Sequence, residues 1–469
     1  MRDHMRYRTW TERRLPQPLL VGGLVSAVVG GSVLMGLRLG NGLTVQAVLP
    51  LGVILGILGL LFVTKYAQTL VLALPLTALF LPTLQIPTGT ESPLPLSLLL
   101  TCVLSGLWIA AVCVRGGSLS PSPLNLPILV FCAICVLSLG WGIVWRDPVL
   151  IKAPKFIVTQ SGALITILMS LVAPLIIGNF VTSERQLRFI FGAFIVGGSL
   201  MTLTQLLGIT QTVLNDRGLW SLWTATPLFG LLIVQPGIRW FWRLVLGGVL
   251  LLHLYLVMVV NADWLSGWFP SVVALAALVF IRSPKLFFAM LPFAGLLLVI
   301  SMGFFATVAQ DNINDGSLER LIIWEQNWRV VQDHWLLGTG PAGYAIYYMS
   351  YFPQEARSTH NNYLDVVAQF GFVGLGCWFW LAWTAVQEGW RLSRRLPSGF
   401  RRTLALTATA GWLGGCVAMF FGDWLLPFAY NQGIAGYKYT VYTWIFLGML
   451  IVLRRLADQD GQLQPTTNG

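Results

Sequence analysis

The stretch "ARSTHNNYLDVVAQFGFVG", residues 356–374, carries a cluster of polar residues into the start of an apolar run. His360 is followed directly by Asn361 and Asn362, and Asp365 lies among the first apolar residues. Polar groups that leave water without a partner are costly, and within a membrane span they usually serve a function. The rest of the sequence defines what surrounds this cluster.

The composition of the chain indicates a membrane protein. Of its 469 residues, 56% are hydrophobic and 10% are charged, and the mean hydropathy is +0.73. A soluble protein carries about 25% charged residues. Apolar runs of about 20 residues recur, which is the length of a helix that crosses a bilayer. Because backbone groups in lipid must be paired within their own segment, we expect an all-α fold, a polytopic transmembrane helical bundle of about 12–14 spans.

The apolar runs also predict how the chain is organised. We expect residues 1–18 to form a basic cytoplasmic tail, residues 19–308 a transmembrane bundle of about 11 spans, and residues 309–360 one large periplasmic loop. Residues 361–453 should hold the last transmembrane helices, and residues 454–469 a second cytoplasmic tail. The individual spans are expected at 19–37, 45–63, 67–84, 95–114, 126–145, 157–178, 187–208, 222–238, 244–261, 265–281, 286–308, 361–384, 403–421 and 437–453.

The net charge of +11 follows from membrane topology rather than from binding of nucleic acid. Most of the 29 lysines and arginines fall in loops on the side that holds the amino terminus, and positive loops mark the cytoplasmic side. Both termini are therefore expected in the cytoplasm. The basic amino-terminal segment has no convincing small-residue cleavage site after it, so we expect an uncleaved first span.

The cysteines predict neither a disulfide framework nor a metal site. Cys132 and Cys135 have the spacing of a CxxC pair, but they lie within an expected span and no second pair accompanies them, so we interpret them as helix packing. All six cysteines fall inside expected spans: Cys102, Cys113, Cys132, Cys135, Cys377 and Cys416.

The expected periplasmic loop contains an amphipathic helix. The stretch "LERLIIWEQNWRVVQDHW", residues 318–335, repeats apolar residues at helical spacing, which predicts one apolar face. Such a helix could lie along the outer membrane interface or cap the bundle, and the two are compatible. The face consists of Leu321, Trp324, Trp328, Val331 and Trp335.

A glycine-rich stretch, "LLGTGPAGY", follows this helix. Its glycines Gly338, Gly340 and Gly343 predict a tight turn in which backbones approach closely. The spacing resembles a nucleotide-binding loop only superficially, because no strand precedes it and it is expected to face away from cytoplasmic nucleotides. In the next span, "GFVGLG" offers small residues for close helix packing.

His360 is the candidate catalytic residue among the histidines. His4 lies in the expected cytoplasmic tail, His253 within a span, and His334 on the amphipathic helix. Only His360 combines an outside location, the start of a helix and polar neighbours. Its alternative role is that of a helix-terminal residue without chemistry.

The start of the next helix bears on the protonation state of this histidine. We expect Ser358 or Thr359 to cap the helix, with His360, Asn361 and Asn362 in its first turn. The positive end of the helix dipole disfavours imidazolium, so the histidine should stay neutral near pH 7. A neutral imidazole is the form that a general base requires.

Two arginines on the expected outer side are candidates for binding phosphate. Arg217 precedes the eighth expected span and Arg320 opens the amphipathic helix. The guanidinium group binds phosphate oxygens bidentately and stays charged. The alternatives are salt bridges with Asp216 or Glu319, or contacts with lipid head groups.

From Arg320 to Gly374 the pattern "R…W…W…DHWLLGTGPAGY…STHNNYLDVVAQFGFVG" resembles the shared motif of the O-antigen ligase and O-antigen polymerase superfamily. The many spans with one large late periplasmic loop are also similar. The resemblance implies an inverting, metal-independent glycosyltransferase in the bacterial inner membrane, with its active site facing the periplasm. Its partners would be a glycan on undecaprenyl pyrophosphate, an acceptor hydroxyl on lipid A-core or another glycan, membrane lipids and other polysaccharide-assembly proteins, with no cofactor, metal or nucleic acid.

The resemblance also assigns roles to residues of this chain. His360 matches the histidine that deprotonates the acceptor, and Arg320 and Arg217 match arginines that hold pyrophosphate. Family members often carry "SR-G" at the start of the tenth span, where this chain has Ser266–Gly267 without an arginine, and Arg357 is a candidate substitute. The expected supporting residues are Asn361, Asn362, Trp324, Gly338, Gly340 and Gly343.

Other functions remain open from the sequence. A polymerase of the same superfamily would use the same donor with another acceptor. A transporter, of inorganic carbon or polysaccharide, should show ionisable residues deep in the membrane or helices broken at matching positions, for which His253, Pro75 and Pro174 are the best candidates. A non-catalytic assembly protein is the third alternative.

Overall fold

The computed structural model describes residues 67–81, 85–86, 94–115, 119–150, 156–209, 218–300, 317–352, 359–427 and 433–462. The chain divides into two units, Met1–Val71 with Cys102–Leu119, and Leu72–Thr101 with Ser120–Gly469. The second unit carries the candidate site, and the contacts described below lie within it. The spans expected at 19–37 and 45–63 fall outside the described residues.

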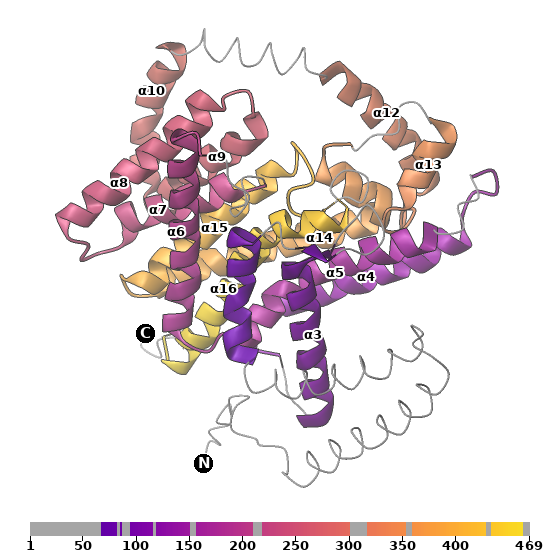
Figure 1. The fold of residues 1–469 in the computed structure, drawn as a ribbon, viewed down its shortest axis with the longest axis horizontal. Helices are drawn as coiled ribbons and strands as arrows, with labels where there is room; N and C mark the ends of the chain where they lie inside the picture. Colours follow the sequence, from indigo (N-terminus) through magenta and orange to yellow (C-terminus); the bar gives the residue numbers. More distant parts are fainter. Residues whose placement is uncertain are drawn as a thin grey trace, which may run out of the picture. The chain divides into compact units, whose positions relative to one another are not determined.

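The described chain is almost entirely helical (Figure 1). Each span that was expected within the described residues coincides with a helix, which confirms the all-α bundle. The strands are one short antiparallel pair, in which β1 (Gln85–Ile86) lies against β2 (Leu94–Pro95). The helices are Ala67–Phe80, α3 (Leu96–Arg115), α4 (Asn125–Val144), α5 (Phe156–Phe180), α6 (Glu184–Leu206), α7 (Trp220–Val234), α8 (Trp240–Tyr255) with the π-helical turn η1 (Leu256–Val260), α9 (Leu265–Arg282), α10 (Pro284–Ile300), α12 (Ser317–Asp333), α13 (Gly343–Tyr351), α14 (Asn362–Arg395), α15 (Phe400–Ala418), the 3₁₀ turn η2 (Ile434–Gly436) and α16 (Tyr437–Gln459).

The length and composition of these helices define a multi-pass membrane protein. Seven helices in the described part are long and apolar enough to cross a bilayer, and shorter apolar helices accompany them. The seven are α4, α5, α6, α8 with η1, α9, α14 and η2 with α16.

Helix α15 is not one of these seven, and its position in the bundle explains why a less apolar sequence suffices. It packs against α7, α9, α14 and α16, so its side chains meet protein instead of lipid. Thr409 is fully buried and donates its hydroxyl to the Ala405 carbonyl at 2.7 Å. Gly389 of α14 leaves the space that this threonine occupies. A central helix of this kind can carry polar side chains at low cost.

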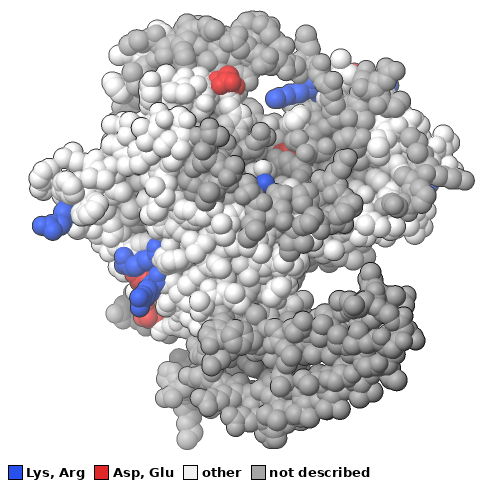
Figure 2. All heavy atoms as spheres, in the orientation of Figure 1, with Lys and Arg blue, Asp and Glu red and all other residues white. Residues whose placement is uncertain are grey.

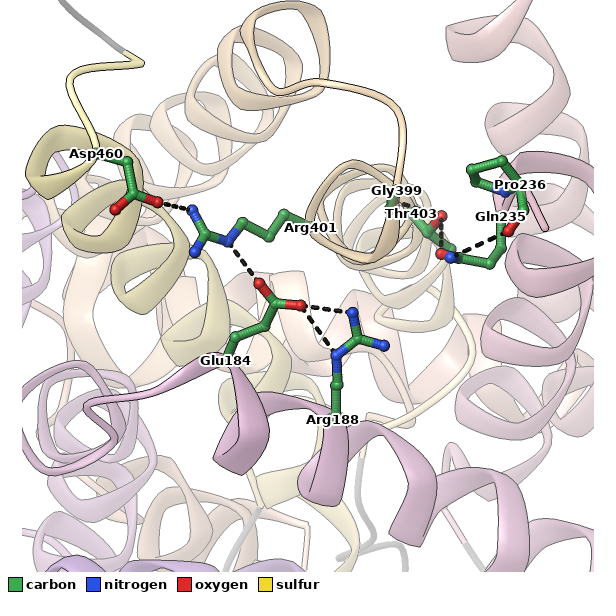
Figure 3. A network of polar contacts seen from close by, with 8 residues as sticks. All are labelled: Glu184, Arg188, Gln235, Pro236, Gly399, Arg401, Thr403 and Asp460. Atoms are coloured by element: carbon green, nitrogen blue, oxygen red, sulfur yellow. Dashed lines mark hydrogen bonds and ion pairs between the residues drawn. The ribbon is translucent and has the colours of Figure 1, made fainter. Parts of the chain in front are cut away.

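Charged residues gather at one end of α6, α15 and α16. Arg401 donates to Glu184 at 2.8 Å and to Asp460 at 2.5 Å, and Arg188 donates to the same glutamate at 2.6 Å (Figure 3). Much of the described surface that is visible in Figure 2 is uncharged, as expected for a surface in contact with lipid. The ion pairs join three helices that are far apart in the sequence.

A second ion pair, between α14 and α16, is more deeply buried. Glu388 is 2% exposed, and Arg454 donates to its two carboxylate oxygens at 2.8 and 2.9 Å. The Nε atom of the same arginine lies 3.7 Å from a carboxylate oxygen of Asp458. Removing one partner of a buried pair leaves the other charge without compensation.

We therefore expect Arg454→Met to lower the free energy of unfolding by about 3 kcal/mol, because the buried Glu388 loses its two close hydrogen bonds and keeps only Arg391, at 4.0 Å. The double variant Glu388→Leu/Arg454→Met should regain most of that loss. Arg188→Met, which breaks a pair whose arginine side chain is 55% exposed, is the matched control and should cost less than about 1 kcal/mol. Denaturant unfolding in detergent micelles measures all three, and equal losses in the two single variants would contradict the prediction.

Candidate functional site

The site is built around a break in α14 at Gly371. This glycine has φ 66° and ψ −170°, which no helix accommodates, and it separates residues 362–370 from residues 372–395. A Cβ at this position would overlap the backbone of Leu336 and Leu337. The glycines of "GFVGLG" were expected to serve helix packing, but the first of them breaks the helix instead, while Gly374 makes room for the Phe370 side chain.

The turn after α12 pairs the backbone groups that the break exposes. Two amides of the turn donate to carbonyls before Gly371, and two amides after it donate to carbonyls of the turn. Unpaired backbone groups at this depth would cost several kcal/mol each. The bonds are Thr339 N to Ala368 O at 2.9 Å, Gly340 N to Gln369 O at 3.0 Å, Phe372 N to Trp335 O at 2.8 Å and Val373 N to Leu336 O at 3.3 Å.

The glycines of the turn have the role predicted for them. Gly338 (φ 68°) and Gly340 (φ 83°) occupy conformations that favour glycine, and a Cβ on Gly338 would overlap the backbone of Gln369. Helix α4 supports the turn from below, since the Ser138 hydroxyl lies 2.6 Å from the Leu337 carbonyl and 2.5 Å from the Gln369 carbonyl. The tight turn with close backbone approach is thus confirmed.

Helix α12 forms as expected, but its apolar face is divided. Ile323, Val330 and Val331 are buried in a cluster with α13 and the start of α14, whereas Trp328 and Trp335 are 44% and 55% exposed. Of the predicted face, Val331 is thus buried against the bundle, while Leu321 and the two tryptophans are exposed. The helix caps the bundle with one side and leaves aromatic side chains exposed on another, which is compatible with an interfacial position.

The loop also contains a helix that was not predicted, α13. Its tyrosines at positions 344 and 348 point toward the start of α14 and toward α12: Tyr344 donates to Asp365 at 2.5 Å, and Tyr348 donates to the Ile323 carbonyl at 2.7 Å. The repeat of tyrosines at i, i+3, i+4 and i+7 in "GYAIYYMSY" was the signal that could have revealed this helix.

The cap of α14 differs from the prediction. Asn361, not Ser358 or Thr359, is the N-cap: its side-chain oxygen accepts from the amides of Tyr363 at 3.0 Å and Leu364 at 3.3 Å. His360 consequently lies before the helix and not in its first turn. Its φ is 49°, in the left-handed region, which costs a residue other than glycine roughly 1–2 kcal/mol.

Contacts on both sides hold His360 in this conformation. Trp324 of α12 donates its indole N–H to the Thr359 carbonyl at 2.8 Å. The Thr359 hydroxyl donates to Asp365 at 2.6 Å and accepts from the Asn361 amide at 3.2 Å. Strained residues persist only where the surroundings determine them this fully, and they are concentrated at functional sites.

Asn362 and Asp365 tie this corner to the segment between α15 and α16. The Asn362 side chain accepts from the amides of Leu425 and Leu426, each at 3.1 Å, and donates to the Leu426 carbonyl at 2.9 Å and to Asp365 at 3.3 Å. Asp365 is 1% exposed, and its hydrogen bonds come from three different elements. The sequence marked Asp365 as unusual but gave it no role, because its partners Thr359 and Tyr344 are brought to it only by the fold.

His360 itself is half-buried beside a cation. Burial, followed by the nearby Arg320 guanidinium, lowers its pKa below the usual 6.5, so the imidazole is neutral at pH 7. The neutral state matches the expectation, but burial and Arg320 replace the helix terminus as its main causes. Arg320 is exposed and lies one turn before Trp324 on α12. The other two proposed phosphate ligands, Arg217 and Arg357, fall outside the described residues.

The strain at His360 can be measured directly. We expect His360→Gly to exceed His360→Ala in free energy of unfolding by about 1 kcal/mol, because only glycine adopts the left-handed conformation without strain. Ala342, with φ 54°, is the control site, where Ala342→Gly should stabilise the protein by a similar amount without loss of function. If His360→Ala were as stable as His360→Gly, the native structure would not hold this residue under strain.

Comparison with known protein families gives a match. Residues 250–379 match the model of the O-antigen ligase family, a segment that runs from α8 through both loop helices and the break in α14. No curated protein matches the chain. His360, Arg320, the glycine turn and Gly371 all lie within the matched segment, and this match supports membership in the O-antigen ligase superfamily.

Proposed function

We propose that this protein is an inverting glycosyltransferase that moves a glycan from undecaprenyl pyrophosphate to an acceptor hydroxyl on lipid A-core or on another glycan. The observation that carries the proposal is the neutral, partly accessible imidazole of His360 beside the Arg320 guanidinium. A base and an anion-binding cation at one corner are the two groups that displacement of a pyrophosphate requires.

In the proposed reaction, His360 accepts the proton of the acceptor hydroxyl. At the same time, the oxygen of that hydroxyl forms a bond to the anomeric carbon of the donor sugar. The bond from that carbon to the pyrophosphate oxygen breaks on the opposite face, and undecaprenyl pyrophosphate leaves with the bonding electron pair. Arg320 binds its phosphate oxygens, and Arg217 and Arg357 are the proposed further ligands. The leaving group is a stabilised anion, so the proposed route needs no metal.

The strained backbone at His360 serves this role. Hydrogen bonds of Thr359, directly before His360, and of Asn361, directly after it, fix the backbone on both sides of the histidine. A base held in place by its neighbours loses little entropy when the acceptor arrives. We therefore assign Trp324, Thr359 and Asp365 to positioning of the base.

The two ends of helix α14 indicate how the protein is oriented in the membrane. Helix α14 begins next to His360 and ends at Arg394 and Arg395, so the site and an arginine-rich end lie at opposite ends of one span. Arginine-rich ends favour the cytoplasm. We propose that the site faces the periplasm from the bacterial inner membrane and that both termini are cytoplasmic.

Removing the base should abolish transfer. In purified protein supplied with lipid-linked glycan and acceptor, His360→Ala should lower kcat/KM by about 10²–10⁴-fold. Arg320→Ala should lower it by about 10²–10³-fold, because a charge stabiliser of the leaving group is lost. Arg329→Ala on the same helix, where the arginine only pairs with Glu325 at 2.8 Å, is the control and should retain activity.

In cells, surface glycan and the lipid-linked precursor report on the same variants. Accumulated lipid-linked polymer in His360→Ala would identify a ligase, and accumulated single repeat units a polymerase, since the two differ in the acceptor. Full restoration of surface glycan by His360→Ala, at wild-type protein level, would refute the proposed catalytic role.

The pH dependence tests the electrostatic pairing. The neutral form of His360 is active, and its pKa is lowered by burial and by Arg320, so the acid limb of kcat/KM should lie below pH 6.5. Arg320→Ala removes a cation that disfavours imidazolium, so the pKa rises and the acid limb of the residual activity should move to higher pH. An acid limb that stays in place in Arg320→Ala would show that the two side chains are not coupled.

A further inference from the structure

A second polar and aromatic cluster lies at the carboxyl-terminal end of α13. Tyr351 donates its hydroxyl to one carboxylate oxygen of Asp147, and the other oxygen accepts from the Val149 amide at 2.9 Å. The Asp147 amide donates to the Tyr347 hydroxyl at 3.3 Å, and the His334 ring meets the Tyr347 ring edge-on with centroids 4.9 Å apart. Three elements thus contribute to the cluster: the end of α4, the end of α12, and α13.

The cluster is accessible and carries a different charge from the His360 site. Tyr351 is 44% exposed, and Trp145, two residues before Asp147, is also exposed and stacks on Trp141. The hydrogen bond from Tyr351 lowers the pKa of Asp147, which keeps it a carboxylate, and burial lowers the pKa of His334, which keeps it neutral. The exposed Asp333 adds a second negative charge nearby.

The one described cation at the edge of the cluster, Arg146, is directed elsewhere. Its guanidinium lies over the Phe156 ring, 5.1 Å from the ring centroid. A pyrophosphate is therefore disfavoured here, whereas an uncharged polyhydroxylated molecule is suited. One face of a sugar ring presents C–H groups that stack on the electron-rich face of an aromatic ring, and its hydroxyls donate to a carboxylate.

We propose that Tyr351, Asp147 and His334 form a glycan-binding subsite for uncharged sugar units of the substrate chain at a distance from the reacting unit. The proposal rests on the glycosyltransferase function proposed above and adds to it a second point of contact. Tyr344, which donates to Asp365, and Tyr351, which donates to Asp147, are seven residues apart on one face of α13. At 1.5 Å of rise per residue this is about 10 Å along the helix axis, which a short run of sugar units bridges.

Equilibrium binding to the full-length protein in lipid nanodiscs tests the subsite. The probe is the surface polysaccharide of the host cells, released from its lipid by mild acid so that no pyrophosphate remains. Tyr351→Ala should raise Kd about tenfold, since it removes both the ring and the hydroxyl that positions Asp147. Tyr351→Phe keeps the ring and should raise Kd about threefold.

Two variants serve as controls. Trp383→Ala removes an aromatic side chain of α14 that is more exposed than Tyr351, at 63% against 44%, and it should leave both Kd and activity unchanged. His360→Ala should keep wild-type Kd while losing transfer, which separates the subsite from the proposed function. If the wild-type protein binds the polysaccharide in a Tyr351-dependent way but transfers no glycan, the proposed glycosyltransferase function is rejected and the subsite is retained.

The opposite results overturn the subsite. If the wild-type protein fails to bind the released polysaccharide, or if Tyr351→Ala binds it with wild-type Kd, the cluster does not recognise glycan. A loss of thermal stability in nanodiscs with unchanged Kd would identify Tyr351 as a membrane-interface anchor instead.

Discussion

The pairing of the broken helix α14 with the turn after α12 is the constraint on which the rest of the site depends. Backbone groups at a break inside a membrane protein must find partners within the protein. Here the amides of Thr339 and Gly340 and the carbonyls of Trp335 and Leu336 provide them. Because the exchange fixes α12 and α13 against residues 362–370, it also fixes the two tyrosines that reach Asp365 and Ile323. The loop is therefore part of the bundle and not an appendage to it.

The same arrangement explains how a strained histidine is maintained. Trp324 reaches the Thr359 carbonyl only because α12 is anchored, and Asp365 can accept from both Thr359 and Tyr344 only because α13 is in place. Asn362 links this corner to residues 425–426, which lie between the two last helices. The cost of the left-handed backbone at His360 is thus met by hydrogen bonds from several distant segments. A half-buried imidazole near the Arg320 guanidinium is the chemical result.

Apolar runs were sufficient to predict the membrane helices of the described residues, since lipid requires both the composition and the length of each span. They could not predict the break at Gly371, because a glycine in an apolar run looks the same whether it packs, bends or interrupts a helix. The cap was placed two or three residues too early, since Thr359 has the right chemistry but its hydroxyl is engaged by Asp365. His360, Arg320 and Trp324 could be proposed as site residues from the sequence because the spacing of a motif is local information. Asp365 and Tyr344 were not assigned roles, because their pairing depends on an unpredicted helix.

A broken helix is also a feature of transporters, in which the free ends of the two halves point at an ion or a substrate. In this protein the backbone groups on both sides of Gly371 are paired with the glycine turn, so they are not available for a cargo. The buried ionisable residue that the sequence offered for a transport path, His253, has its two ring nitrogens within 2.8 Å of the Thr202 hydroxyl and 3.2 Å of the Ser221 hydroxyl. It joins α6, α7 and α8 and is fully buried. These contacts give the helix break at Gly371 and the buried His253 structural roles. We therefore expect the chemistry at the partly accessible pair of His360 and Arg320.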